Sequence, residues 1–147
     1  MLDVGCGPGH LTSHLRSLDV EATGIDLVPE LLNHARGSYP DGRFELASIH
    51  RLPVPDSSIA GILAWYSLIH VPPDDLDGVL GDLRRDSPGS PDGVHGRLDV
   101  SSPVDSAWRL HQAWPDSELI IVDDEGHGGE TMTTHCRAVL ADLAEPG

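Results

Sequence analysis

The sequence predicts an α/β fold, a doubly wound parallel sheet of about six strands with helices on both faces. Three observations support this prediction. Short apolar runs alternate along the chain with segments whose apolar residues recur at helical spacing. A glycine-rich turn follows the first apolar run, and the second run ends in an acidic residue. Alternation of this kind is typical of strand–helix–strand units in a parallel sheet.

Composition limits the classes of partner. The chain has 147 residues, the size of one ordinary domain, and its formal net charge is −15. Nucleic acid and anionic membranes are therefore not expected as partners, because neutralising phosphates requires clustered basic side chains. Two cysteines make no disulfide framework, and no Cys/His spacing is typical of a zinc site. No metal is expected. No apolar run approaches the roughly 18 residues of a membrane span, so we expect a cytoplasmic protein.

The amino-terminal half shows four strand patterns, at residues 1–4, 22–26, 43–47 and 59–66. The last of them is apolar on both faces, as expected for a central parallel strand. Helical spacing follows the first strand at Leu11, Leu15 and Leu18. Pro29 is suited to the first turn of the next helix, and a further helix follows Pro72-Pro73.

The carboxyl-terminal half begins after a Pro/Gly/Ser-rich stretch, residues 86–93, which we interpret as a linker. Beyond it the patterns predict, in order, a strand, a helix, a strand and a helix, at 93–98, 104–114, 118–122 and 132–143. Right-handed crossovers would give the strand order 3-2-1-4-5-6. We therefore expect one α/β domain over residues 1–147, made of halves 1–86 and 93–147.

The glycine-rich turn is the first candidate binding element. Gly5, Gly7 and Gly9 are spaced G-x-G-x-G, which differs from the G-x-G-x-x-G of dinucleotide-binding folds. Such a turn lets the backbone approach a nucleotide-like ligand and directs helix amides at it. Asp26 lies roughly 20 residues after Gly5, where a carboxylate at the tip of the neighbouring strand can accept both ribose hydroxyls.

The segments LDVGCGPGHLTSHL and GIDLVPELLNHAR, residues 2–15 and 24–36, resemble the first two motifs of class I S-adenosylmethionine-dependent methyltransferases. The resemblance extends to about residue 85. It implies a Rossmann-like fold, S-adenosylmethionine as cofactor and a small-molecule methyl acceptor. It also implies that Asp3 holds the methionine amino end through the loop and that Asp26 binds the ribose. The cofactor residues implied are Asp3, Gly5, Cys6, Gly7, Gly9, Asp26, Leu27, Ser48, Ile49 and Trp65.

Two positions bear on how this site would work. The family usually has an aspartate after the third strand to bind adenine, and the matching residue here is Ser48, so that contact is weakened. Trp65 and Tyr66 follow the fourth strand, where the acceptor normally lies, although ordinary strand-end packing explains them equally well. His70 is a candidate base, with a structural or merely exposed histidine as the alternative.

The carboxyl-terminal half resembles a different family. Its G-R-L-D at residues 96–99 and G-H at 126–127 are similar to the final segment of α/β-hydrolase proline iminopeptidases. The resemblance makes Asp99 the triad acid and His127 the triad base. A hydrolase also needs a nucleophile in G-x-S-x-G, which this sequence lacks. The pair could instead be a structural hydrogen bond, or His127 held by Asp99 could act as the base for a methyl acceptor.

Three functions follow. The first is methyl transfer from S-adenosylmethionine to a small molecule. The second is a non-catalytic cofactor-binding or interaction module, left by gene fusion or built by deliberate recombination of two halves. A degenerate hydrolase without its nucleophile is the least favoured.

Overall fold

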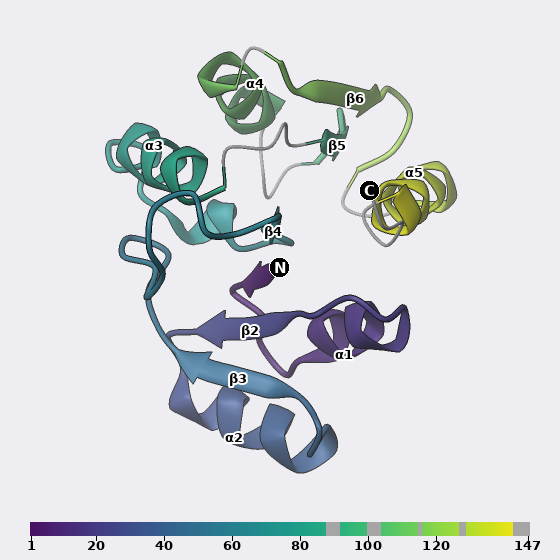
Figure 1. The fold of residues 1–147 in the computed structure, drawn as a ribbon. Coiled ribbons are helices and arrows are strands. Elements are labelled where there is room, and N and C mark those ends of the chain that lie inside the picture. The colour runs from purple at the N-terminus through teal and green to yellow at the C-terminus, as the bar shows by residue number, and fades with distance from the viewer. Residues whose placement is uncertain (88–91, 100–103, 115, 127–128, 143–147) are drawn as a thin grey trace. The chain divides into compact units, whose positions relative to one another are not determined.

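The computed structural model describes residues 1–87, 92–99, 104–114, 116–126 and 129–142. The chain divides into two compact units, residues 1–89 (the amino-terminal unit) and residues 90–147 (the carboxyl-terminal unit) (Figure 1). The boundary falls inside the predicted linker, residues 86–93. That the two halves make one domain remains a prediction.

The amino-terminal unit is built on a parallel sheet with the strand order β3-β2-β1-β4. Its strands are β1 (Leu2–Val4), β2 (Thr23–Asp26), β3 (Arg43–Leu46) and β4 (Ile62–Leu63). Its helices are α1 (His10–Ser17), α2 (Pro29–Ser38), α3 (Leu76–Asp86) and the short 3₁₀ turn η1 (Leu68–His70). This order confirms the predicted parallel α/β fold and the first four positions of its strand order.

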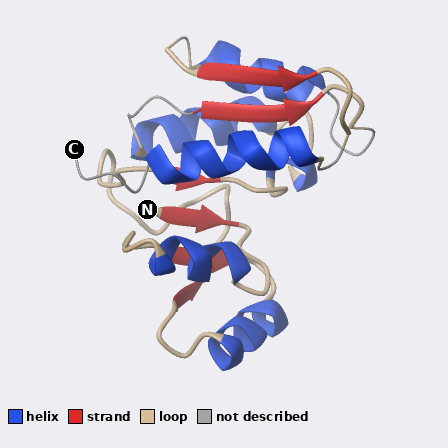
Figure 2. Ribbon diagram, turned by 90° about the vertical axis from the view of Figure 1, so that its right-hand side faces the viewer, coloured by secondary structure: helices blue, strands red, loops and turns tan. Residues whose placement is uncertain are grey.

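The carboxyl-terminal unit contains a two-stranded parallel sheet. Its elements are β5 (Asp92–Gly96), α4 (Val104–Ala113), β6 (Glu118–Val122) and α5 (Glu130–Asp142). β5 pairs with β6 along their whole length, and Figure 2 shows the two strands side by side and pointing the same way. Helix α4 is the crossover between them, as parallel pairing requires.

One part of the predicted topology is corrected. Among the described residues, the six strands lie in two sheets, of four and two strands, and not in a single sheet. The fourth strand was predicted over residues 59–66 but contains only Ile62 and Leu63. Two features of the flanking chain shorten this strand. The backbone amides of Ser57 and Ile59 donate to the last carbonyls of α3, and Tyr66 turns the chain out of the sheet with φ 58°.

The core of the amino-terminal unit forms around β1, whose three residues are all buried. Helix α2 packs against β2 and β3 and buries Leu32 and Ala35 against Phe44 (Figure 1). Leu31 and Leu18 are exposed at 37% each, because Leu31 lies beside the buried stripe of α2 and Leu18 follows the last turn of α1. In the described part of the chain, no helix is long and apolar enough to cross a bilayer.

Candidate cofactor site at the glycine turn

The glycine turn, residues 5–9, connects the carboxyl end of β1 to the start of α1. Gly5, Gly7 and Gly9 adopt φ values of 73°, 52° and 84°, a region that glycine enters without steric cost. A Cβ placed on Gly9 would lie 2.7 Å from the Phe44 ring, so this glycine is required by packing. A Cβ on Gly7 would meet nothing within 4 Å. The open side of Gly7 is therefore where a ligand can approach the backbone.

Asp26 lies beside this open side, as the sequence predicted. Its Oδ2 accepts a hydrogen bond from the Gly7 amide at 2.8 Å, and its Oδ1 accepts one from the Val28 amide at 2.9 Å. Each carboxylate oxygen has a second lone pair, so the half-buried side chain can still accept hydrogen bonds from a diol. The two predicted elements of the site are thus brought together by direct contact.

The backbone amides of the turn itself are bonded within the protein. The amides of Gly5 and Cys6 both donate to the Ile25 carbonyl, at 2.8 and 3.0 Å, and the Gly7 amide is used by Asp26. These three donors are satisfied inside the protein and are not directed at a ligand. A phosphate-binding loop offers such amides to its anion. The turn is consequently suited to a ligand without phosphate groups.

The charge beneath the turn favours a cation. The buried carboxylate of Asp3 accepts a hydrogen bond from the Thr12 hydroxyl at 2.6 Å. Burial raises the pKa of Asp3, the Thr12 bond opposes that shift, and the nearby Asp26 carboxylate adds to it. Burial, followed by the charges of Asp3 and Asp26, raises the pKa of the Cys6 thiol from 9.0 to about 12, so the thiol stays protonated. Asp3 lies behind the turn, which makes its predicted effect on the methionine end indirect.

The residues after β2 and β3 line the side of Asp26. Leu27 is 61% exposed, and so is Leu46, which the sequence did not single out. Leu46 pairs in register with Asp26 at the end of β3, and an apolar residue at the end of a predicted edge strand was the available signal. Ile49 is half-buried, and Ser48 accepts a hydrogen bond from the His50 amide at 3.1 Å.

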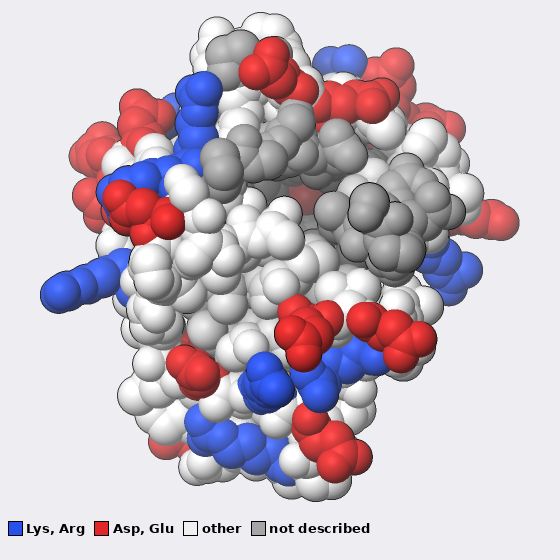
Figure 3. All heavy atoms as spheres, in the orientation of Figure 1, with Lys and Arg blue, Asp and Glu red and all other residues white. Residues whose placement is uncertain are grey.

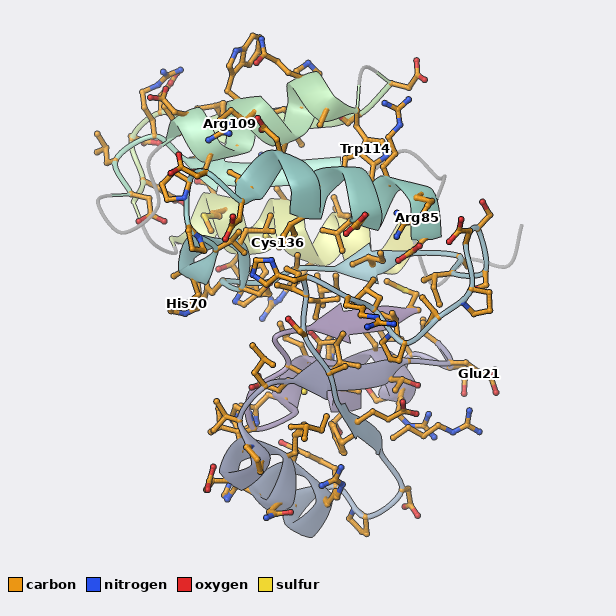
Figure 4. The ribbon with its side chains drawn as sticks, turned by 90° about the vertical axis from the view of Figure 1, so that its left-hand side faces the viewer. Glu21, His70, Arg85, Arg109, Trp114 and Cys136 are labelled. Carbon is orange, nitrogen blue, oxygen red and sulfur yellow. The ribbon has the colours of Figure 1, made fainter. Side chains whose placement is uncertain are left out.

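The segment after β4 lies on the other side of the turn. The rings of Trp65 and Tyr66 are half-buried and stacked at a tilt, with centroids 5.1 Å apart. Ser67 contacts Gly5, a juxtaposition that the sequence did not reveal. His70 is exposed in η1, beyond the carboxyl end of β4, whereas Glu21 precedes β2 at the opposite end of the strands (Figure 4).

The predicted acid and base of the carboxyl-terminal half are only partly visible. Asp99 is 7% exposed and follows β5. His127 lies outside the described residues, so a bond between the two remains a prediction. Among the residues described, no group of three or more His, Cys, Asp or Glu side chains could hold a metal ion.

Comparison with known proteins identifies the family. A family model described as a methyltransferase domain matches residues 1–86, which is more than half of the chain. The chain belongs to this methyltransferase domain family. A solved S-adenosylmethionine-dependent methyltransferase from Methanosarcina mazei shares its fold, with a TM-score of 0.56 and 24% identity over 58% of this chain and 46% of that one.

Two curated relatives match different stretches. A malonyl-[acyl-carrier protein] O-methyltransferase of Erwinia billingiae is 32% identical over 141 residues, 90% of this chain and 53% of the relative. A probable proline iminopeptidase of Streptomyces coelicolor is 50% identical over 48 residues, 33% of this chain and 14% of the relative. The chain thus spans about half, or much less, of the curated proteins that it matches. Both predicted resemblances and the Rossmann-like fold are confirmed.

S-adenosylmethionine is the cofactor that the sequence resemblance implies for this methyltransferase domain, and the residues present fit it. The open face of Gly7 gives room for a ligand against the backbone. The Asp26 carboxylate can accept hydrogen bonds from ribose hydroxyls. The cofactor has no phosphate group, which agrees with a turn whose three amides are already bonded within the protein. Asp3 and Asp26 place negative charge near a ligand that is positively charged at sulfur.

Proposed function

We propose that the chain transfers a methyl group from S-adenosylmethionine to a small-molecule acceptor. The observation that carries this proposal is the Asp26 carboxylate, hydrogen-bonded to Gly7 at 2.8 Å beside the open face of the glycine turn. Three features therefore lie together at the carboxyl ends of the strands. They are a hydrogen-bond acceptor for the ribose hydroxyls, an unobstructed stretch of backbone and a negative potential.

The chain's part in the reaction is positioning. When bound, the cofactor would supply an activated methyl group on a positively charged sulfur. Asp26 would hold the ribose, the open backbone at Gly7 would give the ligand room, and the residues after β4 would align the acceptor. Proximity and alignment of this kind supply most of the catalytic effect when a reactant is already activated.

On the acceptor side we propose Trp65 and Tyr66 as a wall of the site. His70 is the candidate base, and His127 held by Asp99 is its alternative. The relatives named as malonyl-[acyl-carrier protein] O-methyltransferases suggest small carboxylic acids and their thioesters as the first acceptors to screen. On the face shown in Figure 3, the arginines lie among acidic side chains, which supports a reaction without nucleic acid. We also propose a cytoplasmic location.

The test is calorimetric titration of the purified chain with S-adenosylmethionine and with S-adenosylhomocysteine. We expect saturable binding that weakens at least tenfold in Asp26→Ala, because the ribose loses its acceptor and the turn loses the bond to Gly7. Asp41→Ala removes an exposed carboxylate in the turn before β3 and is the matched control. Absence of binding to a folded wild-type chain would refute the proposal.

A second function is favoured by one finding, the match of one third of the chain to proline iminopeptidases. A fusion of this kind leaves a module that binds the cofactor without turnover. It predicts normal calorimetric binding but no methylated product from any acceptor of the screen. Product formation that is lost in Asp26→Ala would exclude it.

A further inference from the structure

Ser67 has a buried hydroxyl at the edge of the candidate site. Among the described residues the oxygen finds no hydrogen-bond partner. Ser67 is the residue before η1, where a serine usually caps the turn, but its side chain makes no capping bond. A buried hydroxyl without a partner is costly, so this oxygen is a candidate to bond a ligand of the site.

The side chain of Ser67 is seated directly against the glycine turn. A Cβ placed on Gly5 would lie 2.5 Å from the Ser67 Cβ and 3.5 Å from its hydroxyl oxygen. Ser67 thus occupies the space that any larger residue at position 5 would need, and Gly5 itself is exposed. The segment after β4 and the cofactor turn are therefore in contact through Ser67 and Gly5.

The residue before Ser67 adds a second indication. Tyr66 has φ 58°, in a region that bulky side chains rarely enter. Backbone strain of this kind costs on the order of 1 kcal/mol or more, and strained residues cluster at active sites and ligand clamps. Here the strained residue aims the chain so that Ser67 lies against Gly5.

We propose that Ser67 binds the amino-acid end of the cofactor, with its hydroxyl oxygen accepting a hydrogen bond from the ligand's ammonium group. This inference rests on the proposed function. The carboxylates of Asp3 and Asp26 make the surroundings of the turn negative, which favours an ammonium donor over an anion at this position. The proposed bond needs the serine hydroxyl to turn toward the ligand, and no covalent step is involved.

The test compares Ser67→Ala with Ser67→Cys. Both retain a side chain of similar size against Gly5, but neither has a good hydrogen-bond acceptor. We expect each variant to bind S-adenosylmethionine about five- to tenfold more weakly. Without ligand, the midpoint of thermal unfolding should be unchanged or raised, since a buried unpaired hydroxyl has been removed. Ser38→Ala, at the exposed end of α2, is the control substitution.

A second ligand shows whether the loss of affinity comes from the amino-acid end of the cofactor. 5′-Methylthioadenosine has the adenosine and sulfur of the cofactor but no amino-acid end. We expect its affinity to be the same in the wild-type chain and both variants.

Three outcomes would overturn the assignment of Ser67. Unchanged affinity for S-adenosylmethionine would refute it while leaving the proposed function in place. Equal weakening of both ligands, or a loss of stability together with affinity, would show that Ser67 acts through packing alone. A folded wild-type chain that binds neither ligand would refute this inference and the proposed function together.

Discussion

The two units are built alike, from parallel strands joined by crossover helices, but they use their carboxyl strand ends differently. In the amino-terminal unit, Asp26 accepts amides from two separate elements, the glycine turn and the start of α2. In the carboxyl-terminal unit, Glu125 also accepts two amides, but both come from the start of α5, at Thr131 and Met132. One carboxylate joins parts of a site, and the other caps a helix.

The chain beside each carboxylate shows the same contrast. Gly7 leaves open space next to Asp26, whereas a Cβ on Gly129 would collide with the Glu125 carboxylate. An exposed ion pair between Arg97 and Asp123 joins the residues that follow β5 and β6. Both units therefore place a carboxylate at or beyond the end of a strand, and the open space lies beside the one next to a turn with positive φ values.

The largest expected effect is the loss of the glycine turn. Gly9→Ala forces a side chain into the left-handed region and places its Cβ within 2.9 Å of both Phe44 and Ala35. We expect the free energy of unfolding of the amino-terminal unit to fall by about 2–4 kcal/mol, from overpacking and backbone strain together. Chemical denaturation followed by circular dichroism measures this.

Gly37→Ala is the matched control, because its Cβ meets nothing within 4 Å and its φ is not left-handed. Equal loss of stability in the two variants would mean that the turn is no more constrained than an exposed helical glycine.

A smaller effect is expected from the buried acid behind the turn. Because the pKa of Asp3 is raised in the folded state, chiefly by burial, its protonated form stabilises the fold. That contribution is fully present below the ordinary value of 3.8 and is lost as pH rises through the folded pKa. Asp3→Asn keeps an acceptor for Thr12 and carries no charge. Its stability relative to the wild-type chain should therefore increase between acidic and neutral pH.

Denaturation at several pH values tests whether the stability of Asp3→Asn rises relative to that of the wild type as the pH increases. The exposed substitution Asp41→Asn is the control. A difference between Asp3→Asn and the wild type that stays flat with pH would show that Asp3 is not penalised by burial. The same variant should bind S-adenosylmethionine several-fold more weakly, since negative charge beneath the turn has been removed.

The sequence predicted the parts of the site that depend on local patterns. The strand–turn–helix segment through Gly9 and the acid that ends β2 are each contained in a few consecutive residues. The strand order of the first four strands follows from right-handed crossovers, which do not depend on side-chain detail. These features can therefore be predicted from the sequence alone.

The parts that the sequence did not predict depend on contacts between distant segments. The apolar run around Ile62 has every local property of a long strand, but the amides before it are bonded to α3 and Tyr66 ends it by a left-handed turn. The contact of Ser67 with Gly5 arises only from this departure. No periodicity or motif encodes it.

The smallest expected effect concerns the buried acid of the carboxyl-terminal unit. Every cofactor residue proposed lies within the matched domain, residues 1–86. Asp99→Asn should therefore leave the affinity for S-adenosylmethionine unchanged within about twofold, because the substituted residue does not contact the ligand. Calorimetry on the variant and on the wild-type chain measures this directly. If Asp99 instead orients His127 as a base, turnover falls while affinity holds. A weakened affinity would mean that the carboxyl-terminal unit contributes to the cofactor site, and the contrast between the two strand ends would no longer hold.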